Sequence, residues 1–358
     1  MTGQPAATGQ QPQAPDNLDA LLVVQAATLL AFEAGSAHAA TGWLRQALAD
    51  LRRSAQRLWL LAGAHPTGTT PLDETAREHT AQQLVLQVRQ IATQLQDGLP
   101  ALLQREADAA LRLGAQHAGE QAGITVDIAQ LVIDETAQRV IQSTPAAAVT
   151  RLLRAADGLA TAQNGQQLQA ALAVADQAVP AVNTGSTYLT NYVANDAARQ
   201  VSANIGAKLL WIAERDACVI CLALAGEIAD PMTGLGFDEF ATYGPYEPPS
   251  IWPYGMPLMR PPRHPHCRCQ VCVWLGTAPG QPDLPSSLKR EAARSILKGW
   301  SLPSESNRVR LRAAEQLLAA GGRGLPRTVQ ERAARDVARG RFESRSVPHH
   351  RPKEKEHV

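Results

Sequence analysis

Cysteines are the residues of this 358-residue sequence best suited to chemistry, and all five lie between residues 218 and 272. Cys218 and Cys221 form a Cys-x-x-Cys pair, and 45 residues separate Cys221 from the Cys267-x-Cys269 pair. Thiolates bind soft metals, and two pairs from distant loops complete the tetrahedron that Zn²⁺ takes in closed structural sites. The spacing therefore predicts a structural Zn²⁺ site.

Histidines beside the second pair enlarge the set of candidate ligands. His264 can replace one cysteine, because two ligands in a Cys-x-Cys pair are more tightly spaced than in Cys-x-x-Cys. The candidate metal ligands are therefore Cys218, Cys221, His264, Cys267 and Cys269. Cys272 and His266 are spare, and we expect a buried thiol at the first and an exposed ring at the second.

Three other interpretations of the cysteines stay open. Structural disulfides require an oxidising compartment, and the first sixteen residues, which contain no Lys or Arg and no apolar core, predict no secretory signal. A thioredoxin-type pair requires a strand and a helix around it, whereas the residues before Cys218 have a helical pattern. Unlinked buried thiols are the third alternative.

The segment that carries the cysteines differs in composition from the rest of the chain. Residues 216–285 hold 12 of the 24 prolines and 7 of the 15 aromatic residues. Proline is excluded from helix interiors and favours turns, so this segment is predicted to be rich in loops. A bound metal would supply the folding free energy that so loop-rich a segment lacks.

The long stretch before this segment is predicted to be helical, which makes the fold class mainly α. Residues 17–215 are rich in Ala, Leu and Gln, and apolar residues recur at helical spacing. The expected helices cover residues 17–33, 37–63, 71–97, 101–122, 125–142, 146–160, 164–178 and 187–215. The resulting organisation is a disordered tail (1–16), a helical body (17–215), a metal-binding module (216–285) and a basic helical tail (286–358).

The helix expected at residues 71–97 has the clearest signals. Its apolar face comprises Leu84, Val88, Ile91 and Leu95, with Leu86 on the far side. Thr70 is the expected N-cap, and Pro71 suits the first helical position. Gly98 and Pro100 are expected to end the helix.

Charge is unevenly distributed, although the total of 34 Lys and Arg nearly balances 33 Asp and Glu. Residues 286–358 carry 17 basic and 8 acidic residues, a net charge of +9, and the remainder carries −8. Helices are expected at 288–298, 307–320 and 328–338, with a disordered charged end. Candidate contacts to the phosphates of double-stranded DNA are Lys289, Arg290, Arg294, Arg308, Arg310, Arg312, Arg332, Arg335 and Arg339. The alternatives are a solvated helix face and a segment that docks on an acidic partner.

The cysteine motif resembles the signature of the phage Mu F-like head morphogenesis family. The matching residues are Asp216, Cys218, Cys221, Leu224 and Gly226, followed by Pro262, His264, Pro265, Cys267, Arg268 and Cys269. One residue separates Asp216 from Cys218 where the family has two. The resemblance covers about residues 102–273.

This resemblance implies a minor capsid protein of a tailed phage, present in few copies near the portal. It implies a role in head morphogenesis, DNA packaging or ejection, with portal and capsid proteins as partners. The expected location is the head interior or portal vertex of the virion, after assembly in the host cytoplasm. The alternative is a zinc-containing nucleic-acid-binding regulatory protein.

Motifs of enzymes and of membrane proteins are weak in this sequence. There is no Gly-x-Ser-x-Gly, no His-Glu-x-x-His and no phosphate-binding loop, and the spacing of His117 and Glu120 does not suit a deaminase. We therefore expect no enzyme activity. The most apolar stretch, residues 20–32, contains Gln25 and Thr28 and is shorter than the ~20 residues of a membrane span, so we expect no membrane contact.

Overall fold

The computed structural model of the chain describes residues 12–214, 217, 219–237, 259–262, 267–276, 283–298, 315, 318 and 327–340. The protein is mainly helical, as predicted. It divides into two compact units: unit 1 comprises residues 1–23, 116–126 and 198–358, and unit 2 comprises residues 24–115 and 127–197. The predicted divisions after residues 16, 215 and 285 follow the chain, whereas unit 1 collects segments that are distant in sequence.

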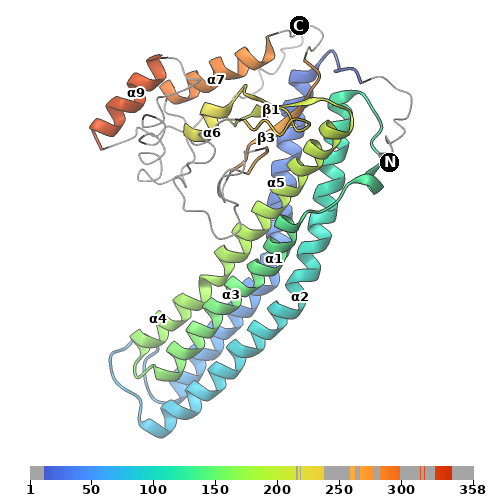
Figure 1. Ribbon diagram of the computed structural model, residues 1–358. Coiled ribbons are helices and arrows are strands. Elements are labelled where there is room, and N and C mark those ends of the chain that lie inside the picture. The colour runs from blue at the N-terminus through green and yellow to red at the C-terminus, as the bar shows by residue number, and fades with distance from the viewer. Residues whose placement is uncertain are drawn as a thin grey trace, which may run out of the picture. The chain divides into compact units, whose positions relative to one another are not determined.

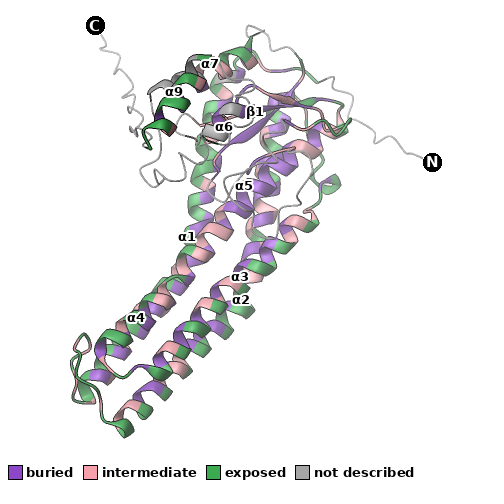
Figure 2. Cartoon of the chain, turned by 60° about the vertical axis from the view of Figure 1, so that its left-hand side comes forward, coloured by how far each residue is buried: buried purple, intermediate pink, exposed green. Residues whose placement is uncertain are grey.

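Unit 2 is a bundle of long helices that lie side by side (Figure 1). They belong to α1 (Leu18–Leu61), α2 (Glu74–Ala122), α3 (Glu135–Thr161), α4 (Gly165–Asp176) and α5 (Ala178–Asn204), with the short 3₁₀ helix η1 (Ile128–Gln130) before α3. Buried and exposed faces alternate along these helices (Figure 2). Ala and Leu at helical spacing therefore form the interior of unit 2, as the periodicity predicted.

The predicted apolar face of α2 is confirmed. Leu84 and Val88 are fully buried, and Ile91 and Leu95 are nearly so, whereas Leu86 on the opposite side is 59% exposed. This helix therefore turns the expected stripe toward the interior of unit 2.

The predicted ends of α2 are wrong. The Asp73 carboxylate accepts hydrogen bonds from the backbone N–H groups of Thr75 (3.0 Å) and Ala76 (3.2 Å), so Asp73 rather than Thr70 caps the helix. The helix then continues through Pro100 to Ala122. Packing of the buried neighbours Leu99 and Leu103 offsets the ~3 kcal/mol that an interior proline costs.

Helices α1 and α3 are also longer than predicted. α1 is continuous where a break was expected at residues 34–36, and α3 continues through Pro145. Both interruptions lie where side chains are buried, at Ser36 in α1 and at Pro145 itself in α3. Tertiary packing therefore overrides the local helix-breaking signals.

α1 is much longer than the apolar stretch at residues 20–32, so its length no longer distinguishes it from a membrane-spanning helix. Within residues 20–61 an 18-residue window has a mean hydropathy of 1.6, and 33% of that window is buried. By length and composition alone, this helix could cross a membrane. The core helix of a soluble protein meets the same criterion, so the criterion does not separate the two cases.

Small residues bring helices of unit 2 close together. A Cβ atom on Gly114 of α2 would collide with the backbone carbonyl of Ala194 on α5. A Cβ atom on Gly185 of α5 would likewise collide with the side chain of Thr144 on α3. Glycine is therefore required at both helix crossings.

Polar side chains are buried between α1 and α5. Asn191 donates a hydrogen bond from Nδ2 to Oε1 of Glu33 at 2.7 Å, and the hydroxyls of Ser36 and Ser186 lie 3.0 Å apart. Asn195 donates to the backbone oxygen of Asn191 at 2.8 Å. The interior of unit 2 thus contains a hydrogen-bonded polar seam within an otherwise apolar core.

Unit 1 contains an antiparallel three-stranded sheet in the order β2-β1-β3. Its strands are β1 (Lys208–Ile212), β2 (Ile228–Ala229) and β3 (Gln270–Trp274). The helix predicted at residues 187–215 is therefore wrong beyond Asn204. Gly206 adopts a positive φ of 68°, and the N–H of Ala207 bonds to the carbonyl of Ser202 at 2.9 Å, which ends α5 before β1 begins.

One face of this sheet packs on the start of α1. Its buried core comprises Ala14, Leu18, Leu22, Leu210, Cys272, Trp274 and Leu284. On β1, the Trp211 ring meets Phe237 edge to face, with ring centroids 5.1 Å apart. The sheet is therefore apolar on both faces.

Glutamines on unit 1 satisfy the backbone at β3. Oε1 of Gln121, on α2, accepts a hydrogen bond from the backbone N–H of Val273 at 2.8 Å. Gln270 donates from Nε2 to the carbonyl of Leu22 at 3.3 Å. A side chain of α2 thus accepts a backbone hydrogen bond from β3, which is an edge strand, and a side chain of β3 donates to the backbone of α1.

Beyond the helices shared with unit 2, the described residues of unit 1 contain α6 (Val219–Leu224), α7 (Leu284–Lys298) and α9 (Arg327–Ala338). α7 packs against both α6 and α9. The predicted helices at 288–298 and 328–338 are confirmed. That at 307–320 falls outside the described residues except for Glu315 and Leu318, which are both helical.

Candidate metal centre

Three of the predicted ligands lie together in unit 1. The Sγ atoms of Cys221, Cys267 and Cys269 are all within 4.8 Å of one another, and those of Cys221 and Cys267 are 3.7 Å apart. At most 5% of each residue is exposed. Cys221 and the Cys267–Cys269 pair, which 45 residues separate in the sequence, therefore form one buried thiol cluster.

The register of the sheet explains this meeting. Ile212, the last residue of β1, pairs with Gln270, the first residue of β3. Because the strands are antiparallel, Cys269 and Cys267 precede β3 at the edge where the chain leaves β1 toward α6. Cys221 lies on α6. The sheet thus brings Cys267 and Cys269 to the helix that carries Cys221.

Backbone hydrogen bonds fix the return of the chain after α6. The N–H of Gly226 donates to the carbonyl of Trp211 at 2.9 Å, and the N–H of Trp211 donates to the carbonyl of Glu227 at 3.0 Å. Gly226 has a φ of 77°, and a Cβ atom there would collide with the carbonyl of Pro285. This glycine therefore allows α6 to turn directly back into the sheet.

The sulfur spacing suits a tetrahedral metal. With metal–sulfur bonds of about 2.3 Å, the sulfurs of a tetrahedral Zn²⁺ site lie about 3.8 Å apart. The Cys221–Cys267 separation of 3.7 Å is close to this value. Three buried thiols in a loop-rich part of the chain can therefore hold a metal ion.

The other proposed ligands lie outside the described residues. These are Cys218, which precedes α6, and His264 before the second cysteine pair; the spare His266 is also outside. Within the described part of the chain, none of Cys221, Cys267, Cys269 and Cys272 forms a disulfide.

Cys272 belongs to a different environment, as predicted for a buried thiol. It lies on β3 among the apolar residues around Leu18 and Leu210, and its Sγ donates to the carbonyl of Val273 at 3.2 Å. Burial strongly raises the pKa of this thiol, because the thiolate would be desolvated. It therefore remains neutral and apart from the cluster.

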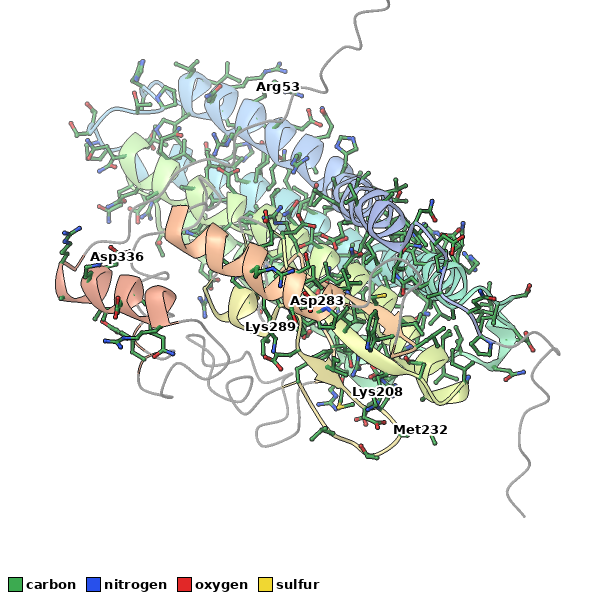
Figure 3. The ribbon with its side chains drawn as sticks, turned by 90° about the horizontal axis from the view of Figure 1, so that it is seen from above. Arg53, Lys208, Met232, Asp283, Lys289 and Asp336 are labelled. Carbon is green, nitrogen blue, oxygen red and sulfur yellow. The ribbon has the colours of Figure 1, made fainter. Side chains whose placement is uncertain are left out.

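Two of the proposed DNA-contacting residues form ion pairs within unit 1. Nζ of Lys289 lies 2.7 Å from Oε1 of Glu227, and a nitrogen of Arg290 lies 3.0 Å from Oδ2 of Asp283. Lys289 and Asp283 are labelled in Figure 3. Hydrogen bonds from Ser286 and then Arg290 lower the pKa of Asp283. These pairs reduce the positive charge that Lys289 and Arg290 offer to a phosphate.

The structure describes the side chains of only some of the remaining basic candidates. Arg335 and Arg339, at the end of α9, are exposed. Arg308, Arg310 and Arg312, together with the side chains of Arg294 and Arg332, lie outside the described residues.

Two further features are potential chemical sites. His117 and Glu120 lie one turn apart on α2, and burial lowers the pKa of the His117 imidazole while Glu120 opposes that shift. In unit 2, a partly open groove of about 520 Å³ is lined by Ala147, Thr150, Arg151, Arg154, Val174 and Gln177. Its lining offers two guanidinium groups and no carboxylate.

Comparisons with protein families, with curated proteins and with solved structures give no match to this chain.

Proposed function

We propose that this protein is a minor head protein of a tailed phage, acting in head morphogenesis, DNA packaging or ejection near the portal. The supporting observation is the meeting of Cys221 with Cys267 and Cys269 in one buried cluster. These residues come from the two separated motifs that carry the resemblance to the Mu F-like family. A segment between them that varies in length would leave their meeting intact, because β1 and β3 bring them together.

Zn²⁺ is the proposed occupant of the cluster. Three thiols favour a soft or borderline metal over Mg²⁺ or Ca²⁺, and their spacing suits a tetrahedral ion. Cys218 or His264 would supply the fourth ligand. A closed four-ligand site would stabilise the fold of unit 1 and leave no position for a substrate, so the proposed role is structural rather than catalytic.

The proposed partners are portal and capsid proteins, and the proposed location is the virion. Nothing in this role requires a membrane. Electron microscopy of assembled particles, with the protein carrying a density label, tests it. Density at the portal vertex or inside the head is expected, and label absent from purified particles would overturn the proposal.

The metal is tested by elemental analysis of the purified protein. We expect about one Zn²⁺ per chain in the wild type and a loss of most of it in Cys267→Ser and Cys269→Ser. Cys272→Ser is the matched control, because this cysteine lies on β3, three residues after Cys269, and outside the cluster. Less than about half an equivalent in the wild type would overturn the zinc centre without affecting the particle experiment.

The alternative proposal is a zinc-containing regulatory protein that binds nucleic acid. The exposure of Arg335 and Arg339 favours it, whereas the ion pairs of Lys289 and Arg290 weaken it. Double-stranded DNA binding by the full chain, measured at several salt concentrations, is compared with Arg335→Gln/Arg339→Gln and with deletion of residues 286–358. Affinity that survives the deletion overturns the DNA contact of the tail, and a full chain that does not bind DNA overturns this alternative.

A further inference from the structure

Over residues 20–39 of α1 the exposed side of the helix is apolar, and the buried side contains polar residues among its leucines and alanines. Its buried positions include Gln25 and Glu33, and the exposed fraction of each is 5% or less. Its exposed positions hold Ala, Val, Leu and Gly with only Thr28 and His38 as polar residues. The Thr28 hydroxyl donates to the carbonyl of Val24 at 2.9 Å, so it too is satisfied within the helix. No charged side chain is exposed along this part of α1.

Four of the exposed residues form a seam, here called the α1 stripe: Val23, Ala27, Leu30 and Ala34. Val23 is 71% exposed and Leu30 is 44% exposed, and Val24 beside them is 62% exposed. The steps of four, three and four residues follow the alternation of d and a positions in a heptad repeat. The stripe therefore suits a second helix rather than a flat surface.

The order of large and small residues points to a specific occupant. In an antiparallel pair with its two-fold axis midway between Ala27 and Leu30, Val23 faces Ala34 of the other copy and Ala27 faces Leu30. Each large side chain then meets a small one, which is the arrangement that fills a helix interface. A parallel pair would place Leu30 on Leu30 and Ala27 on Ala27, which alternates crowding with gaps.

Charge supports the same occupant. Two copies of a stripe without charge meet with no like-charge repulsion, and antiparallel helix dipoles attract. A second copy brings a seam of identical length, spacing and composition, as a two-fold interface requires. We propose that the α1 stripe is an interface on which two copies of this chain associate through antiparallel α1 helices.

The expected affinity is modest. Eleven residue steps of helix extend about 17 Å, which buries less area than a stable, permanent dimer requires. The association should therefore depend on concentration within the micromolar to millimolar range. This inference does not depend on the metal centre or on the proposed role in a phage head.

Sedimentation equilibrium of the full-length chain tests the interface. The mass should rise from 38.3 kDa at low concentration toward twice that value at several hundred micromolar. Leu30→Glu should abolish the rise, while Leu86→Glu should not, because Leu86 is an equally exposed leucine (59%) on α2. Circular dichroism checks that each variant keeps its helices.

A charge pair tests the antiparallel orientation. Ala27→Lys and Leu30→Glu should each abolish association, and the double variant should restore it at low salt, because residue 27 faces residue 30 of the other copy. Restored association of the double variant supports the antiparallel pair. A double variant that is folded but does not associate overturns it. A single mass at every concentration, equal losses in Leu30→Glu and Leu86→Glu, or binding to phosphatidylcholine vesicles without a rise in mass would each overturn the interface.

Discussion

At the scale of single residues, the described cysteines occupy two different environments. Cys272 lies on β3 with Leu210 and Leu18, in a purely apolar environment. Cys269 directly precedes the same strand but lies within the thiol cluster with Cys221. Cys269, a potential metal ligand, and Cys272, a buried neutral thiol, are therefore only three residues apart.

The raised pKa of Cys272 predicts a loss of stability in alkaline solution. Above pH ~9 the unfolded chain releases the Cys272 proton while the folded chain retains it, so the free energy of unfolding falls by up to ~1.4 kcal/mol per pH unit from this group. Below the unfolded pKa the contribution is complete. Urea denaturation at pH 8, 9 and 10 should show a steeper decline for wild type than for Cys272→Ala. Equal slopes would contradict the burial of this thiol.

At the scale of elements, the packing of the long helices in unit 2 is determined at the points where they cross. Glycines at 114 and 185 allow backbones to approach at positions where any side chain would collide. Buried Glu33 and Asn191 add a directional hydrogen bond between α1 and α5. The crossings thus determine both the distance between helices and the rotation of each one.

Gly114→Ala should destabilise the protein by about 1–3 kcal/mol, because its Cβ atom forces α2 away from Ala194. Gly42→Ala is the matched control: Gly42 lies within α1, and a Cβ atom there has no neighbour within 4 Å. The control should be neutral or stabilising by up to ~1 kcal/mol through helix propensity. Thermal unfolding of both variants measures the difference, and a neutral Gly114→Ala would disprove the close crossing.

Gln121 links α2 to the sheet of unit 1. Gln121→Leu leaves the buried N–H of Val273 without the acceptor it has in the wild type, which should cost about 1–3 kcal/mol. Gln121→Glu keeps an oxygen at this position and should lose less. Hydrogen exchange at Val273 should rise in the leucine variant, and unchanged protection would show that Gln121 does not support β3.

Local sequence signals predicted the faces of these elements better than their ends. The spacing of Leu84 and Val88 predicted the buried side of α2, because periodicity records which residues meet the core. Pro100 suggested a helix end that does not occur, since the packing on either side of it is a tertiary effect. Gly206 is a typical helix-ending residue before β1, but the helical pattern across residues 187–215 predicted a helix that continues past it.

The candidate site shows the same division. Cysteine spacing predicted Cys221, Cys267 and Cys269 as ligands, and the structure brings these three together. The means of bringing them together, the pairing of β1 with β3, was not predicted. Five-residue strands give little periodicity of their own, and their pairing across more than 50 residues leaves no local trace.

At the scale of the whole molecule, the cysteine cluster belongs to unit 1, while unit 2 is stabilised by helix packing. A metal bound at the cluster would therefore contribute its free energy first to the sheet and to α6. Helices α1, α2 and α5 each contribute residues to both units. Unfolding in unit 1 can therefore extend along these helices into unit 2.

Chelation should separate the two units experimentally. Under the proposed zinc centre, removing the metal should raise hydrogen exchange in β1 and β3 by at least an order of magnitude, or ~1.4 kcal/mol in local stability. Residues 81–111 of α2, deep in unit 2, should change little. Readdition of Zn²⁺ should restore protection in the strands. Protection that is unchanged throughout would contradict a stabilising metal.

Unit 1 combines segments that are far apart in the sequence, and this affects when it can fold during biosynthesis. Leu18 and Leu22 emerge from the ribosome first, but their partners Cys272 and Trp274 follow about 250 residues later. The helices of unit 2 can pair during this interval, whereas the apolar start of α1 has no completed sheet to cover it. Chains that terminate before β3 would expose this surface permanently. The emergence of β3 and Leu284 therefore sets the earliest moment at which the apolar start of α1 can be buried.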